Sequence, residues 1–206
     1  MPKCLTEQEQ SINQHPHLAP GDALSALRIA TADRHAVLDT GMPLAQPDAG
    51  LQHYSDHLHM LRRWLAPLEP WLGRYSDGPQ GEAGLPAVAR VALIDADLAD
   101  AALAGVRADA RLEDDTVWPD GASAAYRWGV TYVIEGSQLG GAVLYQRLAG
   151  PLAPHPLRYL RSGAEGPGPR WRSFMLALRE NVRSEGEIAD ACRGACDAFD
   201  RILAMR

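Results

Sequence analysis

The sequence contains little cysteine and no long apolar run. Its 206 residues include three cysteines, Cys4, Cys192 and Cys196, and this odd number without a regular spacing argues against a secreted disulfide scaffold. No apolar run reaches the roughly 18 uncharged residues that a membrane-spanning helix needs. Residues 1–20 also lack the apolar stretch of a signal peptide. We therefore expect a cytoplasmic protein with no membrane partner.

An excess of basic charge is absent as well. The formal net charge is −6, whereas binding to nucleic acid requires a basic surface, so we expect no nucleic-acid partner. Arg158, Arg161, Arg170 and Arg172 nevertheless gather late in the chain and are compatible with an anionic ligand. Hydrophobic residues make up 46% and charged residues 22% of the sequence, which is ordinary for a globular domain.

Signals for β-strands are also missing. The chain has no run of alternating β-branched residues and no hairpin dipeptide between such runs. Segments rich in glycine and proline instead separate stretches with helical periodicity. These patterns predict an all-α fold, with a flexible tail over residues 1–20 and a single domain over 21–206. The expected helices cover residues 22–39, with Asp22 as N-cap, then 49–72, 86–106, 122–148, 156–160, 169–183 and 187–205.

The helix expected over residues 122–148 contains Gly136, Gly140 and Gly141. Each glycine inside a helix costs about 1 kcal/mol relative to alanine, so three of them need a compensating reason. Their spacing predicts bare backbone on one side of the helix, where a flat ligand or another helix can approach closely. The residues alone leave these two interpretations open.

His35 is the second unusual feature, because it falls on the apolar face of the first expected helix with Thr31 and Leu38. A histidine on such a face is more often structural than a metal ligand. Arg28, however, lies seven residues earlier on the same face, about 10 Å along the helix axis. An imidazole with a cation at that distance suits a metal macrocycle with carboxylate arms.

Other metal motifs are lacking. His53 and His57 are spaced i, i+4 in the second expected helix, but they fall outside its leucine stripe, and we expect them on a solvated face. The Glu-x-x-His pairs of a di-iron bundle are absent, and so is a Cys-x-x-Cys-His motif for covalent haem attachment. The tryptophans are interpreted as core or interface residues.

Three segments together resemble one known family. ALRIATADRHAVLD (26–39) is similar to the first-helix motif of haem oxygenases, LRxATxxxHxxLD, and WGVTYVIEGSQLGGAVLY (128–145) is similar to their distal helix. EGSxLG is the usual form of that helix in the bacterial branch. RYLRSG (158–163) and PRWRSF (169–174) resemble a late segment of bacterial members. The matches occur in the family's order and extend from about residue 22 to the C-terminus.

The resemblance implies a role for each matching position. His35 becomes the proximal ligand of the haem iron, and Gly136, Gly140 and Gly141 become the glycines over the distal side of the haem. Ser137 occupies the position of an aspartate that orders distal water in mammalian members, and bacterial members commonly have serine there.

Three further positions of the resemblance concern contacts with the haem. Arg28 takes the place of a basic residue that meets a haem propionate, and Arg172 falls near a second position of this kind. Thr31 lies on the same helix face as His35 and is expected at the haem.

The implied activity is oxidative cleavage of haem b to biliverdin, carbon monoxide and Fe²⁺, with O₂ and with electrons from a reductase or ferredoxin-like donor. A non-catalytic haem carrier of the same fold is the principal alternative. A thiaminase-like enzyme would need a cysteine nucleophile in the central pocket, which the positions of Cys192 and Cys196 in the last helix disfavour. A helical interaction domain without a ligand is the third alternative.

Overall fold

The structure, a computed structural model, describes residues 22–106, 117–161 and 166–205. Within these residues the chain forms α-helices, short 3-10 helices and no strand, which confirms the predicted all-α class. The predicted tail over residues 1–20 lies outside the described part. No described helix is both long and apolar enough to cross a membrane. The α-helices are α1 (Ala23–Gly41), α2 (Leu51–Leu72), α3 (Arg90–Leu98), α4 (Ala124–Leu148), α5 (Arg158–Arg161), α6 (Gly168–Asn181) and α7 (Glu185–Ala204), and the 3-10 helices are η1 (Pro43–Ala45), η2 (Gly78–Gln80) and η3 (Ala101–Leu103).

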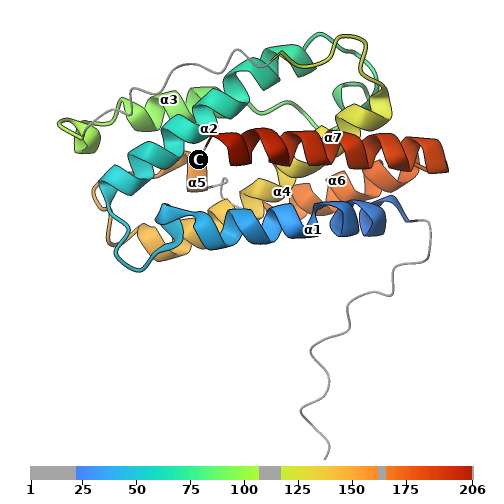
Figure 1. Cartoon of the computed structure of the whole chain (residues 1–206). Coiled ribbons are helices and arrows are strands. Elements are labelled where there is room, and N and C mark those ends of the chain that lie inside the picture. Colours follow the sequence, from blue (N-terminus) through green and yellow to red (C-terminus); the bar gives the residue numbers. More distant parts are fainter. Residues whose placement is uncertain (1–21, 107–116, 162–165, 206) are drawn as a thin grey trace, which may run out of the picture.

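The last helix, α7, is the centre of the bundle. It lies between α2 on one side and α1 and α4 on the other, and packs against all three (Figure 1). Its buried face consists largely of small residues, among them Ala191, Ala195 and Ala198, each with no exposed surface. Small side chains allow neighbouring helix axes to approach closely, so α7 positions the helices around it.

The contact between α4 and α7 is made by backbone rather than by side chains. A Cβ atom added to Gly129 would lie 1.8 Å from the carbonyl oxygen of Ala191, and one added to Gly194 would lie 2.1 Å from that of Tyr126. Neither position can therefore carry a side chain without moving a helix. The glycines that serve helix packing are these two, and the sequence analysis did not identify them.

The start of α1 is fixed by a single carboxylate. The Ser25 amide donates to Asp22 Oδ2 at 3.2 Å, which confirms the predicted N-cap, and Arg179 Nε of α6 donates to Asp22 Oδ1 at 2.8 Å. The Arg179 guanidinium lowers the pKa of Asp22 by this hydrogen bond. Further along α1, Arg34 Nε lies 2.7 Å from Asp200 Oδ1 on α7. These contacts tie α1 to both α6 and α7.

The third helix is shorter than predicted. The expected range was 86–106, but α3 begins at Arg90 and ends at Leu98, followed by η3. Its beginning is set from α2, because Glu69 Oε1 accepts hydrogen bonds from the amides of Arg90 at 2.7 Å and Val91 at 3.1 Å. A carboxylate at the first turn satisfies amides that have no partner within a helix. This tertiary cap, rather than the local sequence, decides where α3 starts.

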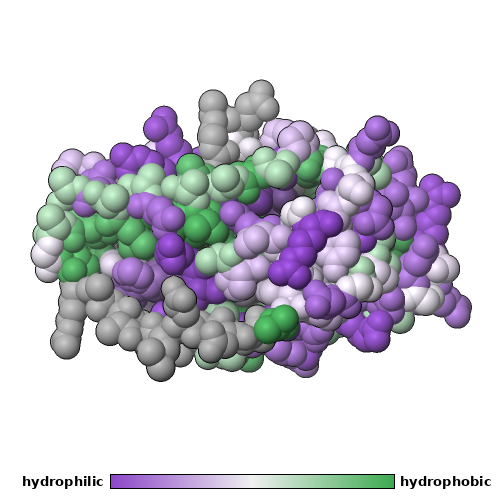
Figure 2. Space-filling view, turned by 90° about the horizontal axis from the view of Figure 1, so that it is seen from above, coloured by the Kyte–Doolittle hydropathy of each residue, from purple (hydrophilic) through white to green (hydrophobic). Residues whose placement is uncertain are grey.

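Hydrophobic surface is unevenly distributed on the face seen in Figure 2. Most of that face is hydrophilic or mixed, and hydrophobic residues gather toward the end that carries α3 in Figure 1.

Gly129→Ala is predicted to destabilise the protein. The added methyl group has no space against the Ala191 carbonyl, and overpacking of this kind typically costs about 1–3 kcal/mol. Gly140→Ala is the matched control on the same helix, because no heavy atom lies within 4 Å of the Cβ position there. The control is expected to gain up to about 1 kcal/mol from helix propensity. Urea unfolding followed by circular dichroism measures both, and equal stabilities would contradict the close packing of α4 on α7.

Candidate functional site

The site begins where α1 and α4 meet. Burial raises the pKa of the Tyr132 hydroxyl on α4, and the nearby Arg28 charge and a hydrogen bond with the Thr31 hydroxyl partly oppose this effect. Thr31 is buried, and its hydroxyl also donates to the Leu27 carbonyl within α1 at 2.8 Å. The Thr31 and Tyr132 side chains therefore meet between the two helices.

From this side-chain contact α1 and α4 run in the same general direction, from right to left in Figure 1. One helical turn further along α1 lies His35, and one turn further along α4 lies Gly136. Four residues advance each chain by about 6 Å along its axis. The structure thus brings the predicted metal ligand and the first of the three glycines to corresponding levels of the two helices.

His35 lies at the edge of the buried stripe of α1 rather than within it. Its side chain is 62% exposed, and its Nδ1 atom lies 2.9 Å from Asp39 Oδ2. The ring also contacts Phe199 of α7, with centroids 5.9 Å apart. Histidines that bind metals commonly donate their other ring N–H to a carboxylate. This arrangement leaves Nε2 available as a ligand, and the i, i+4 spacing of Asp39 was the signal that the sequence analysis missed.

The three glycines of the distal motif differ in their surroundings. A Cβ atom on Gly140 would meet no heavy atom within 4 Å, and one on Gly136 would meet only the Trp171 ring at 3.7 Å. Gly141 is buried and faces Leu160 of α5, at 3.6 Å from its Cδ2 atom. Gly140 therefore exposes bare backbone, whereas the Trp171 ring of α6 partly covers Gly136. At neither glycine does the backbone of another helix lie within 4 Å of the Cβ position, in contrast to Gly129 and Gly194. Gly141 is turned away from that side because it lies about 100° further around the helix than Gly140.

Ser137 belongs to the side of α4 that faces α5. The Ser137 hydroxyl donates to the Ile134 carbonyl at 2.8 Å, and Gln138 Nε2 lies 3.4 Å from the Ser137 hydroxyl oxygen. Gln138 Nε2 also lies 3.1 Å from the hydroxyl oxygen of Tyr159 on α5. A polar group therefore lies directly behind the exposed glycine backbone.

Arg28 and Arg172 are both exposed. Among the described residues neither forms a hydrogen bond or an ion pair, whereas Arg34, Arg170 and Arg179 each bind a carboxylate within 3 Å. Arg28 is on the same side of α1 as His35, and Arg172 adjoins Trp171. Arg28 acts on the Asp22 carboxylate only as a nearby charge, so both guanidinium groups can still bind an anionic group.

A buried ion pair network, which the sequence analysis did not identify, supports α4 beside Gly136. Glu135 Oε1 lies 2.8 Å from Arg90 Nη2 of α3, and its Oε2 lies 2.8 Å from Arg170 Nε of α6. Burial acts to raise the pKa of Glu135, but the hydrogen bond from Arg170 and the charge of Arg90 outweigh it and lower the pKa below its ordinary value. Arg170 immediately precedes Trp171, so this network also fixes the ring beside Gly136.

The second pair of histidines has other roles than a metal site. His53 Nδ1 accepts a hydrogen bond from the Gly50 amide at 3.1 Å and helps to cap α2. The expectation that His57 is solvated is wrong, because its Nδ1 is enclosed without a partner among the described residues. Burial lowers the pKa of His57 to about 4, so the ring is neutral. The described part of the chain contains no cluster of three or more metal-ligating side chains.

Cys192 and Cys196 are free thiols on α7. Burial raises the pKa of both, and the nucleophilic form of cysteine is the thiolate. Cys196 Sγ lies 3.5 Å from the Ala30 carbonyl oxygen of α1. Neither thiol is activated, which weighs against a thiaminase-like enzyme.

Comparisons with known proteins agree with this architecture. The fold resembles the NO- and CO-bound haem oxygenase of Neisseria meningitidis with a TM-score of 0.69, over 91% of this chain and 90% of that one, at 24% sequence identity. A curated haem oxygenase of Xanthomonas campestris is 43% identical over 88 residues, which are 42% of this chain. The match spans about half the length of that relative, 53%. No family model matches the chain. The chain therefore has the single-domain helical fold of the haem oxygenases.

Glu135→Gln is predicted to reduce stability, since it leaves Arg90 as a buried charge without its partner. Removing one member of a buried ion pair costs about 3–5 kcal/mol. Because the pKa of Glu135 is lowered in the folded state, its contribution is fully present above the ordinary value of 4.5 and is lost as the pH falls through the folded-state value. Urea unfolding as a function of pH tests this.

The control is Asp95→Asn, which breaks the exposed ion pair between Asp95 and Arg62. An exposed pair contributes about 1 kcal/mol or less, so this variant is expected to stay close to the unmodified protein. If Glu135→Gln lost no more stability than the control, the buried network would not support α4.

Proposed function

We propose that this protein is a haem oxygenase, which cleaves haem b to biliverdin, carbon monoxide and Fe²⁺ with O₂ and electrons from a separate donor protein. One observation carries the proposal: the bare backbone of Gly136 and Gly140 lies on α4 at the level where His35 projects from α1. The fold and the curated relative support it.

The residues present fit a haem group. The site offers an imidazole whose Nδ1 is already held by Asp39, so that its Nε2 can bind iron. It offers open space over Gly140, where a flat ring can approach the helix backbone. It also offers Arg28 and Arg172, two cations without an anionic partner in the described structure, for the two propionates.

The roles of the chain's own groups follow from this arrangement. When bound, haem supplies both the iron that activates O₂ and the porphyrin that is oxidised. His35 would hold the group through Nε2, and the Asp39 carboxylate keeps the imidazole oriented. Gly136 and Gly140 bring no acidic or basic side chain to their side of the site, so a proton there would have to come from a neighbouring hydroxyl group or from water. Arg28 and Arg172 would bind the carboxylates of the group.

His35→Ala tests the function most directly. Protein, haemin and ascorbate are mixed in air, and loss of the Soret band and growth of biliverdin absorption are followed. The unmodified protein is expected to convert haemin, whereas His35→Ala should keep its helical circular dichroism and lose turnover, with partial rescue by added imidazole. His59→Ala, a histidine on α2, is the control and should behave as the unmodified protein.

Other outcomes of this assay separate the alternatives. A Soret band that persists unchanged under ascorbate would indicate a haem carrier rather than an enzyme. No Soret band at all would indicate an interaction domain, and normal turnover by His35→Ala would refute its assignment as iron ligand.

Gly140→Leu tests the glycine face. The free protein should remain folded, with stability unchanged or raised by up to about 1 kcal/mol, because the side chain enters open space and helix propensity improves. Haemin binding or turnover should fail, because leucine then occupies the space that the ring needs. Melting temperature of the free protein and haemin titration are measured on the same sample. A stable variant with normal turnover would exclude Gly140 from the site.

A further inference from the structure

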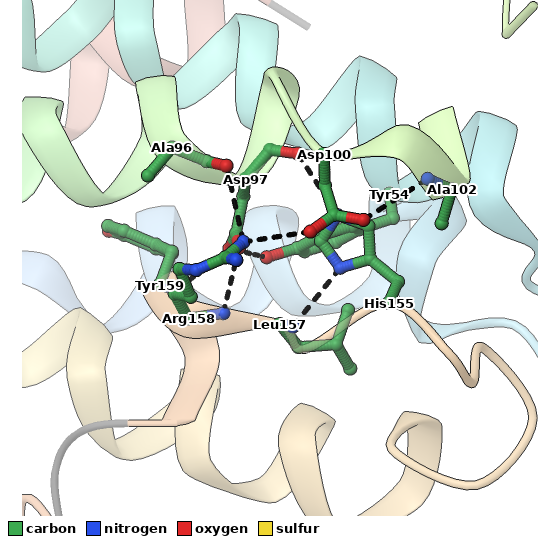
Figure 3. Close-up of polar contacts among 9 residues, drawn as sticks. All are labelled: Tyr54, Ala96, Asp97, Asp100, Ala102, His155, Leu157, Arg158 and Tyr159. Atoms are coloured by element: carbon green, nitrogen blue, oxygen red, sulfur yellow. Dashed lines mark hydrogen bonds and ion pairs between the residues drawn. The ribbon is translucent and has the colours of Figure 1, made fainter. Parts of the chain in front are cut away.

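Asp97 of α3 is a fully buried carboxylate that joins three helices (Figure 3). Its Oδ2 atom accepts hydrogen bonds from the Tyr54 hydroxyl of α2 at 2.6 Å and from the Tyr159 amide of α5 at 2.9 Å. Its Oδ1 atom accepts from the Arg158 amide at 3.0 Å and from Arg158 Nη1 at 3.2 Å. The two amides open the first turn of α5, so Asp97 caps this short helix from α3.

The segment that leads into α5 is held by the same residue. The Leu157 amide donates to His155 Nδ1 at 3.1 Å, which leaves the ring proton on Nε2. His155 Nε2 can then donate to the backbone carbonyl oxygen of Asp97, which lies 3.0 Å away. Arg158 also reaches Asp100, at 3.1 Å from Nη1 to Oδ2. Both the carboxylate and the carbonyl of Asp97 therefore determine where α5 begins (Figure 3).

The opposite side of α5 rests against the glycine segment of α4. The Tyr159 hydroxyl meets Gln138 Nε2 at 3.1 Å. Burial raises the pKa of this hydroxyl, and the Glu69 carboxylate of α2 adds to the effect. Hydrogen bonding with Gln138 and Ser137 and the charge of Arg90 on α3 partly oppose it. The phenol is therefore protonated at neutral pH and lies beside Ser137.

The next residue of α5 makes the second contact. Leu160 Cδ2 lies 3.6 Å from the position of a Cβ atom on Gly141. Because Tyr159 and Leu160 follow each other on a helix of four residues, a shift of α5 would move both contacts at once.

We propose that Asp97 is a positioning residue for the distal side of the site: by capping α5 it holds the Tyr159 hydroxyl against Ser137 and Gln138, behind the exposed glycines. Tyr159 then provides a fixed, protonated hydroxyl at the back of the glycine segment. This inference rests on the proposed haem oxygenase function, because it concerns the side on which oxygen would react.

The experiment compares Asp97→Asn with Tyr159→Phe by two measurements. The first is hydrogen exchange of the Arg158 and Tyr159 amides in the protein without haemin. Asp97→Asn should accelerate it about tenfold through the loss of a charged acceptor, and Tyr159→Phe should leave it nearly unchanged. The second is the midpoint pH at which the visible spectrum of the haemin complex changes between its acid and alkaline forms. Both variants should move this midpoint in the same direction, by up to about one unit, which corresponds to one hydrogen bond.

The double variant and a matched control complete the design. Asp97→Asn with Tyr159→Phe should shift the midpoint no further than Tyr159→Phe alone, because both changes act through one hydroxyl. Asp197→Asn is the control, since Asp197 also accepts a tyrosine hydroxyl at 2.6 Å, from Tyr126 near the start of α4. It should leave the midpoint unchanged.

The possible outcomes separate the positioning role of Asp97 from the proposed haem oxygenase function. Failure of the unmodified protein to form a haemin complex would overturn the proposed function. If the haemin complex forms normally but Tyr159→Phe leaves the midpoint pH unchanged, the inference alone is overturned. Because this result does not need the Asp97→Asn variant, it can be obtained even if Asp97→Asn does not fold. Accelerated exchange in Asp97→Asn with an unchanged midpoint would reduce Asp97 to a purely structural residue and also overturn the inference.

Discussion

The backbone contact between α4 and α7 is the constraint on which the other features depend. Gly129 and Gly194 let the two helices touch without intervening side chains. The ion pair between Arg34 and Asp200 then joins α1 to α7. Both walls of the candidate site are therefore built on one central helix. The side-chain contact between Thr31 and Tyr132 then indicates which turns of α1 and α4 lie at the same level.

Within the described part of the chain, the arginines of the core have carboxylate partners, whereas the arginines at the candidate site do not. The buried Arg90 is paired with the buried Glu135, which also binds the half-buried Arg170, because an unpaired charge in the interior is costly. Arg28 and Arg172 have no such partner among the described residues, and both are exposed. The charge that the fold leaves uncompensated is thus placed where an anionic ligand is proposed to bind.

Much of the fold could be predicted from local sequence. Glycine- and proline-rich segments mark the ends of most helices, and the limits of α2 and α4 lie within two residues of those expected. The limits of α3 could not be predicted, because Glu69, a residue of another helix, caps its first turn. Local patterns carry no information about such a tertiary contact.

The candidate site was predictable to the extent that its residues form sequence motifs. The motifs identify His35 and the glycines at positions 136, 140 and 141. They do not indicate which glycines of the chain serve helix packing and which face open space. Gly129 and Gly194 serve packing and Gly140 faces open space, and nothing in the one-dimensional sequence distinguishes them. Asp97 was missed because the partners of its carboxylate come from α2 and from α5, far away in the chain.

The open side of α4 has a consequence for the protein before it meets any ligand. Val143, seven residues after Gly136 on the same side of the helix, is 67% exposed, although it is an apolar residue in a packed bundle. The free protein is in this sense a bundle with an incomplete core, and a flat apolar ligand would be its missing part. Folding and ligand supply are then thermodynamically linked, because a ligand present at a hundred times its Kd adds about 2.7 kcal/mol to the stability of the state that binds it. The lifetime of the chain in a cell would accordingly follow the availability of such a ligand.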